Sequence, residues 1–114
     1  MRRVLLAALA GLCVSSAVAA DDVVVAHVYD KTGPLEAYAK QTQNGLMLGL
    51  EYATQGTMTV AGRKIRVIEK DNQGKPDVAR AQLASAYADD NADIAVGPTS
   101  SAGPPALRPI AAAY

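Results

Sequence analysis

The sequence predicts an α/β fold, a doubly wound parallel sheet with the order strand, helix, strand, helix, strand, helix. Three runs rich in valine and isoleucine alternate with three segments in which apolar residues recur at helical spacing. The connections between them are short, which favours right-handed crossovers and helices on both faces of the sheet. Half of the 114 residues are hydrophobic and 19% are charged, a balance that argues against intrinsic disorder.

Residues 1–20 are set apart because they have the order of a secretory signal peptide. Two arginines precede an apolar run over residues 4–14, and small residues follow up to Ala20. A retained membrane anchor is the alternative, but the run is shorter than the about 20 residues that a spanning helix needs. We therefore expect cleavage after Ala20 or the residue before it. The mature chain, residues 21–114, then contains no cysteine, since Cys13 is the only one.

The first predicted strand covers residues 23–29, a nearly continuous apolar run typical of a strand buried on both faces. Turn residues follow, and apolar residues at helical spacing predict a helix over residues 35–54, ended by Gly56. Gly45 and Gly49 lie four residues apart on this helix. Because each glycine costs a helix about 1 kcal/mol, the pair predicts a close approach of the helix to the sheet.

The second predicted strand covers residues 64–71, after a tight turn at residues 62–63. Its polar ends favour an edge position in the sheet. A second helix begins at Pro76 and Asp77, residue types that suit the first turn of a helix. Polar residues 89–91 end it.

The third predicted strand covers residues 92–97, and a third helix runs from Pro104 to Tyr114. Because the first strand is the most apolar and the second the most polar, we expect the order 2-1-3. The third strand then has a free edge, for which Ile94 and Val96 are too apolar. We therefore expect this sequence to be part of a longer chain. A complete small domain, or one that dimerises through this edge, is the alternative.

A ligand site is predicted where the strand order reverses, beyond the carboxyl ends of the first and third strands. Residues 29–34 and 97–103 converge there. Thr99, Ser100 and Ser101 lie just before the third helix, whose free N–H groups and dipole favour an anion such as a carboxylate or phosphate. The serines are equally compatible with a role as helix caps.

The residues argue against several other chemistries. The formal net charge is zero, which removes the usual electrostatic basis for nucleic-acid binding. There is no phosphate-binding lysine motif and no G-x-G-x-x-G after the first strand, and the acidic residues are not spaced as a calcium loop. Ser101 lacks the glycine of a nucleophile elbow, since Thr99 stands there. His27 lies within the first strand and suits a core position or a site wall. We expect no catalysis, cofactor or metal.

The motifs then form a recognisable series. In order, they are Thr32-Gly33-Pro34-Leu35, Asn44-Gly45, Gly62-Arg63-Lys64-Ile65, Asp71, Pro76 with its alanine-rich helix, and Ile94-Ala95-Val96-Gly97-Pro98 with Ser101. Together with the signal peptide, this series resembles the Leu/Ile/Val-binding family, the periplasmic substrate-binding proteins of branched-chain amino-acid-type ABC importers. The resemblance covers essentially the whole mature chain.

This resemblance implies a type I periplasmic binding fold, in which two lobes clamp a ligand. Residues 21–114 would be the first half of the N-terminal lobe. By position, Ser101 matches the serine that receives the ligand carboxylate, and Tyr38 matches an aromatic residue that lines the cleft, although a core tyrosine is equally compatible. The predicted ligand-binding residues are Ser101, Ser100, Thr99, Tyr38, Tyr29 and Ala102.

The first loop departs from the family, because residues 29–31 read Tyr-Asp-Lys where amino-acid binders tend to have small or apolar residues. The ligand class therefore stays open between branched-chain amino acids and other small carboxylates such as aromatic acids. The resemblance implies a periplasmic, monomeric receptor that delivers its ligand to an ABC permease. The alternatives are a ligand-sensing ectodomain of similar fold and a secreted hydrolase that uses Ser101.

Overall fold

Strand β1 (Val23–Tyr29) lies at the centre of the fold. The computed structural model describes residues 21–114, so the predicted signal peptide lies outside the described residues. The other elements follow in chain order: α1 (Glu36–Ala53), β2 (Thr59–Val60), β3 (Arg63–Asp71), α2 (Pro76–Ala88), β4 (Ile94–Val96) and α3 (Pro104–Ala113). Every predicted strand and helix is present, with ends that differ from the predicted ones by at most two residues.

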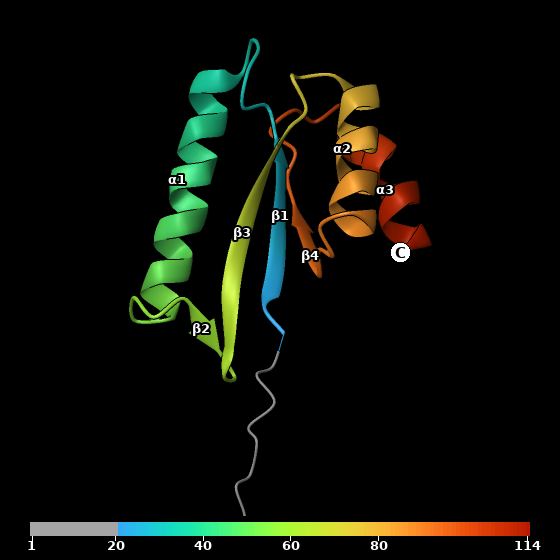
Figure 1. Cartoon of the computed structure of the whole chain (residues 1–114). Helices are drawn as coiled ribbons and strands as arrows, with labels where there is room; N and C mark the ends of the chain where they lie inside the picture. The colour runs from blue at the N-terminus through green and yellow to red at the C-terminus, as the bar shows by residue number, and fades with distance from the viewer. Residues whose placement is uncertain (1–20) are drawn as a thin grey trace, which may run out of the picture.

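The sheet has the strand order β2-β3-β1-β4, which confirms the predicted order of the three main strands. β1 pairs in parallel with β3 over its whole length and with β4 over residues 25–27. Helix α1 lies on one face of the sheet, and α2 and α3 lie on the other (Figure 1). Because β3, β1 and β4 run in the same direction, their carboxyl ends reach the same edge of the sheet.

Strand β2 is an element that the sequence analysis does not predict. It pairs antiparallel with the start of β3, Thr59 opposite Lys64 and Val60 opposite Arg63, so the sheet is mixed at this edge. The two residues between the strands, Ala61 and Gly62, have φ angles of 49° and 78°. Positive φ at both central residues is the geometry of the hairpin turn that matches the twist of its strands, which explains the short pairing.

The apolar core lies between the sheet and the helices α2 and α3. Val28 of β1 packs there with Ala79 and Leu83 of α2 and Leu107 of α3. The next residues along β1 point to opposite faces, so His27 and Tyr29 lie on the α1 side instead. The core therefore joins three segments of the chain that are distant in sequence.

Helix α1 is packed more loosely than α2. Ala39 is its one fully buried residue, and Leu46 and Leu50 are half-buried. The prediction that Gly45 and Gly49 bring α1 close to the sheet is wrong, because a Cβ atom built on either glycine meets no atom within 4 Å. Both glycines are exposed, so they lie on the helix face opposite the contacts. Among residues 21–114, no helix is long and apolar enough to cross a membrane.

A close backbone contact fixes the point where β4 ends. Gly97 has a φ angle of 116°, and a Cβ atom on it would lie 2.0 Å from the carbonyl oxygen of Val28. No side chain fits in that space. A Cβ atom on Gly103 would similarly lie 2.2 Å from Cγ of Pro98, so both ends of the loop between β4 and α3 need glycine.

Leu83→Ala is expected to lower the free energy of unfolding by about 2–5 kcal/mol, because it leaves a cavity in the core. Leu83 is 1% exposed. Urea unfolding followed by circular dichroism measures the change. Leu48→Ala is the matched control, since Leu48 is 65% exposed and its loss should cost little. Equal losses in the two variants would contradict the assigned core.

Gly97→Ala is expected to destabilise the fold far more than Gly56→Ala. Both glycines have positive φ angles, but only at Gly97 does the added methyl group meet backbone, while at Gly56 nothing lies within 4 Å. The Gly56 variant therefore carries the backbone strain of about 1–2 kcal/mol alone. Melting temperatures of the two variants measure the difference, and similar values would contradict the close contact.

Candidate functional site

Three loops meet at the carboxyl edge of the sheet, over residues 30–35, 72–75 and 97–103 (Figure 1). The first two are tied together, since the Asn72 N–H donates to the carbonyl of Tyr29 over 3.0 Å. The strand order reverses between β1 and β4 at this edge, as the predicted site requires.

The loop between β4 and α3 is a tight turn that exposes Ser101. The Gly103 N–H donates to the carbonyl of Ser100 over 3.1 Å, and the Ala102 N–H donates to the Ser100 hydroxyl over 3.3 Å. Ser101 and Ala102 are exposed, whereas Thr99 and Ser100 are half-buried. The turn therefore holds Ser100 by its own backbone and leaves the Ser101 hydroxyl available to a ligand.

The start of α3 supplies fewer backbone donors than the sequence analysis expects. Pro104 and Pro105 carry no N–H group, and the Ala106 N–H donates to the carbonyl of Gly103 over 2.9 Å. The expectation of free helix amides is therefore wrong. The N-cap residue is Gly103 and no side chain caps the helix, so the capping alternative for the two serines is also excluded.

The loop itself carries the free donors. Among residues 21–114, no acceptor receives a hydrogen bond from the backbone N–H groups of Thr99, Ser100 or Ser101. Together with the Ser101 hydroxyl, these groups form a set of donors just before the positive end of the α3 dipole. Such an arrangement favours a bound anion.

Tyr38 lies in the first turns of α1, close in sequence to the loop that leaves β1. Its side chain is 65% exposed, so Tyr38 is not part of the core that residues 21–114 form. An exposed aromatic ring at this position is available to a ligand or to another part of a longer chain. Its place in a cleft stays a prediction.

Tyr29 is buried on the α1 side of the sheet, with 2% of its surface exposed. Its hydroxyl donates to Glu69 of β3, and its ring stacks on His27 with the ring centres 4.2 Å apart. His27 in turn hydrogen-bonds through Nδ1 to Oε1 of Gln43 on α1 over 2.5 Å. Because Glu69 and the loop after β4 lie on opposite sides of β1, the structure does not bring the Tyr29 hydroxyl to Ser101.

Glu69 connects β3 to the loop after β1. Besides the Tyr29 hydroxyl, it pairs with the ammonium group of Lys31 over 3.2 Å. The hydrogen bond from Tyr29 holds the pKa of Glu69 below its ordinary 4.5, against the opposing effect of burial, and Lys31 adds to this effect. Burial, and then the bond to Glu69, raise the pKa of Tyr29 above its ordinary 10.0.

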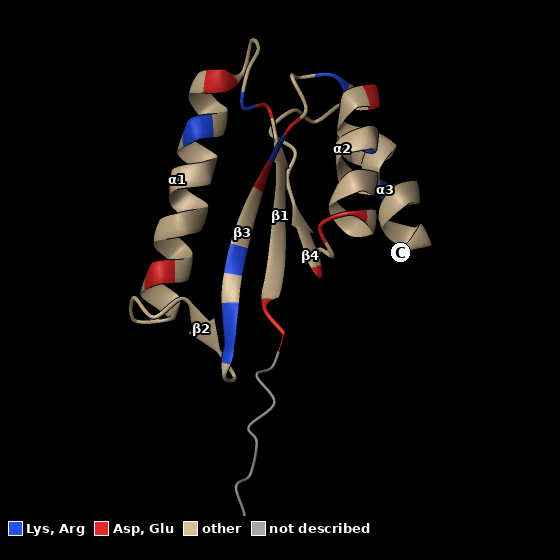
Figure 2. Cartoon of the chain, viewed as in Figure 1, with Lys and Arg blue, Asp and Glu red and all other residues tan. Residues whose placement is uncertain are grey.

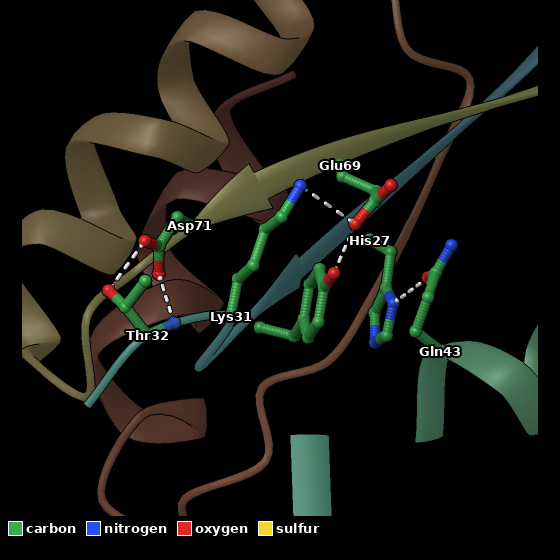
Figure 3. Close-up of polar contacts among 7 residues, drawn as sticks. His27, Lys31, Thr32, Gln43, Glu69 and Asp71 are labelled. Carbon is green, nitrogen blue, oxygen red and sulfur yellow. Dashed lines mark hydrogen bonds and ion pairs between the residues drawn. The ribbon is translucent and has the colours of Figure 1, made fainter. Parts of the chain in front are cut away.

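Asp71 makes a second connection between β3 and the loop after β1 (Figure 3). It accepts hydrogen bonds from the Thr32 hydroxyl over 2.7 Å, the Thr32 N–H over 3.2 Å and the Gln73 N–H over 2.9 Å. Burial alone would raise the pKa of Asp71, but these bonds and the Lys31 charge outweigh it and lower the pKa. Asp71 therefore orders the turn after β3.

Two buried polar residues, Asp30 and Asn72, are not among the predicted site residues. Each directly follows a strand, Asp30 after β1 and Asn72 after β3. A polar residue at the carboxyl end of a buried strand is the signal that would have marked them.

A wide hollow of about 660 Å³ lies at the opposite edge of the sheet, far from Ser101. Its lining is charged, and Figure 2 shows acidic residues at the start of β1 beside basic ones on β3. These charges are engaged within the chain: Arg63 donates to the carbonyls of Asp21 over 2.7 Å and Asp22 over 2.9 Å. The contacts between the residues that line this hollow therefore hold the start of the described chain against β3. Within residues 21–114, no cluster of acidic, histidine or cysteine side chains is arranged to hold a metal ion.

Glu69→Gln is expected to weaken the acid dependence of stability. Because the pKa of Glu69 is lowered in the folded state, the ionised form stabilises the fold above pH 4.5, and this stability is lost as the pH falls below that value. Urea unfolding at a series of pH values measures the slope. Glu51→Gln, at an exposed position on α1, is the control. An unchanged slope in the Glu69 variant would contradict the assigned bond.

Several solved structures share this fold. An ABC transporter protein from Rhodopseudomonas palustris is 63% identical, with a TM-score of 0.79 over 81% of this chain and 27% of that chain. An ABC-type branched-chain amino acid transporter from R. palustris CGA009 is also 63% identical, with a TM-score of 0.79 over 81% of this chain and 25% of that one.

A more distant structure is a solute-binding protein from R. palustris BisB5 in complex with 3,4-dihydroxybenzoic acid. It is 28% identical, with a TM-score of 0.72 over 79% of this chain and 24% of that chain. The present chain therefore spans about a quarter of each of these solved chains. No curated protein sequence matches it.

The model of one protein family, described as periplasmic binding protein, matches residues 22–114. This match begins one residue after the start of the described chain and covers every strand and helix. The strand order and the solved structures agree with it. The chain therefore belongs to the periplasmic binding protein family, and its fold is that of the first half of a lobe in the substrate-binding proteins of branched-chain amino-acid-type ABC transporters.

Proposed function

We propose that this chain is part of an extracytoplasmic receptor of an ABC importer that binds a small carboxylate. The candidate ligands are branched-chain amino acids and aromatic acids. The carboxylate site consists of the Ser101 hydroxyl and the backbone N–H groups of Thr99 and Ser100. Ala102, which is exposed, lies beside them in the same loop.

One observation carries this proposal, the set of free donors in the loop between β4 and α3. A carboxylate needs several hydrogen-bond donors when it leaves water, and charge-assisted bonds are the stronger ones. The exposed Ser101 hydroxyl and the unengaged loop amides supply such donors without any lysine or arginine. The positive end of the α3 dipole stabilises the same charge.

The relatives support the ligand class. A solved chain that is 63% identical to this one is described as a branched-chain amino acid transporter. A chain that is 28% identical holds 3,4-dihydroxybenzoic acid, which is an aromatic carboxylic acid. Both ligand types carry a carboxylate, which is the group that the loop donors suit.

Of the two remaining candidate residues, only Tyr38 is available to the rest of the ligand. Tyr38 is exposed and offers a ring face or a hydroxyl to it. Tyr29 is buried and its hydroxyl is held by Glu69, so its contribution is indirect: together with His27 it supports the end of β1 from within the fold. A second lobe then closes over the ligand by a hinge motion, and no covalent bond is made or broken.

Within residues 21–114, the position of the one histidine does not suit a hydrolase that uses Ser101. The chain contains one histidine, His27. It is buried, and its Nδ1 is engaged with Gln43 on α1, on the face of the sheet opposite the core. Among residues 21–114, no histidine is therefore placed to act as a base for Ser101, and the proposal gives the serine the role of a donor to the ligand.

The proposed setting follows from the family. An importer receptor acts outside the cytoplasm, so the predicted signal peptide over residues 1–20 would be removed on export. The receptor would work as a monomer and deliver its ligand to a permease in the inner membrane, with no nucleic acid or cofactor involved.

Ser101→Ala is expected to weaken ligand binding by about 10- to 100-fold, the effect of losing one hydrogen bond to a charged group. Isothermal titration calorimetry of the mature full-length protein measures it, with leucine, isoleucine, valine and hydroxybenzoic acids as the panel. Ser85→Ala is the matched control, because Ser85 lies near the carboxyl-terminal end of α2, away from the carboxyl edge of the sheet. Unchanged affinity in the Ser101 variant would remove this residue from the site.

A further inference from the structure

Asp30 is a buried acid with no assigned role. It directly follows β1 and is 0% exposed. Among residues 21–114, no donor forms a hydrogen bond with either oxygen of its carboxylate. Leaving a buried carboxylate without a partner costs several kcal/mol, so a group that donates to it is expected at this place.

A small cavity lies against Asp30. Its volume is about 10 Å³, and its walls come from all three loops of the carboxyl edge and from the first turn of α2. Asn72, Ser100 and Gly103 are among its lining residues. A cavity of this size holds a single water molecule, and water stays in a cavity only where polar groups face it.

The surroundings favour water over a cation. The amino-terminal end of α2 carries the positive end of its dipole, and Lys75 and Pro76 of that end line the cavity. A metal ion such as sodium would be repelled by the positive end of the dipole. A neutral molecule that donates to the carboxylate meets no such penalty.

We propose that one buried water molecule bridges the Asp30 carboxylate and the Ser100 hydroxyl. The Ser100 oxygen already accepts the Ala102 N–H, so its hydrogen is free to donate to the water. The water in turn donates to Asp30. Through this bridge Asp30 acts as a positioning residue, because it connects the end of β1 to the turn that presents Ser101.

The direct test is a crystal structure of the mature full-length protein at a resolution that shows ordered water. The expected result is one water within hydrogen-bond distance of both the Asp30 carboxylate and Ser100 Oγ. A protein donor bonded directly to Asp30, or a cation coordinated by it, would overturn the proposal.

A double-mutant cycle tests the bridge in solution. Asp30→Ala and Ser100→Ala are each expected to lower the melting temperature by several degrees, and the double variant by less than the sum, because one bridge is lost in all three. Asp77→Ala replaces Asp30→Ala in the control cycle, since Asp77 is an exposed acid at the start of α2, and its effect should add to that of Ser100→Ala. Additive losses for Asp30 would overturn the bridge.

The conservative variant Asp30→Asn tests whether the side chain at position 30 acts as a hydrogen-bond acceptor or only fills space. It keeps one carbonyl acceptor for the water and is expected to recover most of the melting temperature lost in Asp30→Ala. It also keeps the fold testable if the alanine variant does not fold, in which case the cycle is run with Asp30→Asn. An asparagine variant no more stable than the alanine variant would contradict a role as acceptor.

The consequence for ligand affinity rests on the proposed function. Asp30→Asn is expected to weaken binding by several-fold, since the turn that carries Ser101 is less well held, and Asp77→Asn is expected to leave it unchanged. A protein that binds none of the carboxylates would overturn the proposed function, while the crystal structure and the cycle would still decide on the water. Equal affinity of the Asp30→Asn variant and the wild type would overturn the positioning role.

Discussion

The parallel pairing of β1 with a neighbour on each side is the constraint on which the rest of the structure depends. Val24, Val25, Ala26 and Val28 are all buried, so this strand is enclosed by both its edges and its faces. Parallel neighbours also leave the sheet at the same edge. Segments that begin at residues 30, 72 and 97 therefore meet although they are far apart in the chain, and the polar contacts of the candidate site become possible only there.

The two faces of β1 bind their helices by different means. Val28 points toward α2 and α3 and contributes to an apolar core, which is non-directional and strong. His27 and Tyr29 point toward α1 and meet it and β3 through a few directed hydrogen bonds. Helix α1 therefore depends more on particular polar partners than α2 does, and regions with few buried apolar contacts open at lower free energy.

Most of the fold is predictable because its signals are local, such as the valine run of β1 or the proline at position 76 that opens α2. Strand β2 is not predicted because two residues are too few to form a pattern, although Gly62 marks the turn that follows it. The place of the site follows from the strand order. The general rule that a helix begins with free N–H groups does not hold for α3, because Pro104 and Pro105 carry no N–H group. The burial of Asp30 depends on three distant loops, which no local pattern encodes.

The hydrogen bonds of Arg63 to the beginning of the described chain affect which substitutions are tolerated there. The guanidinium holds main-chain carbonyls of residues 21 and 22, which every amino acid possesses. Substitutions of the side chains at these two positions therefore leave both hydrogen bonds available, and the anchorage of the central strand does not depend on which residues stand there.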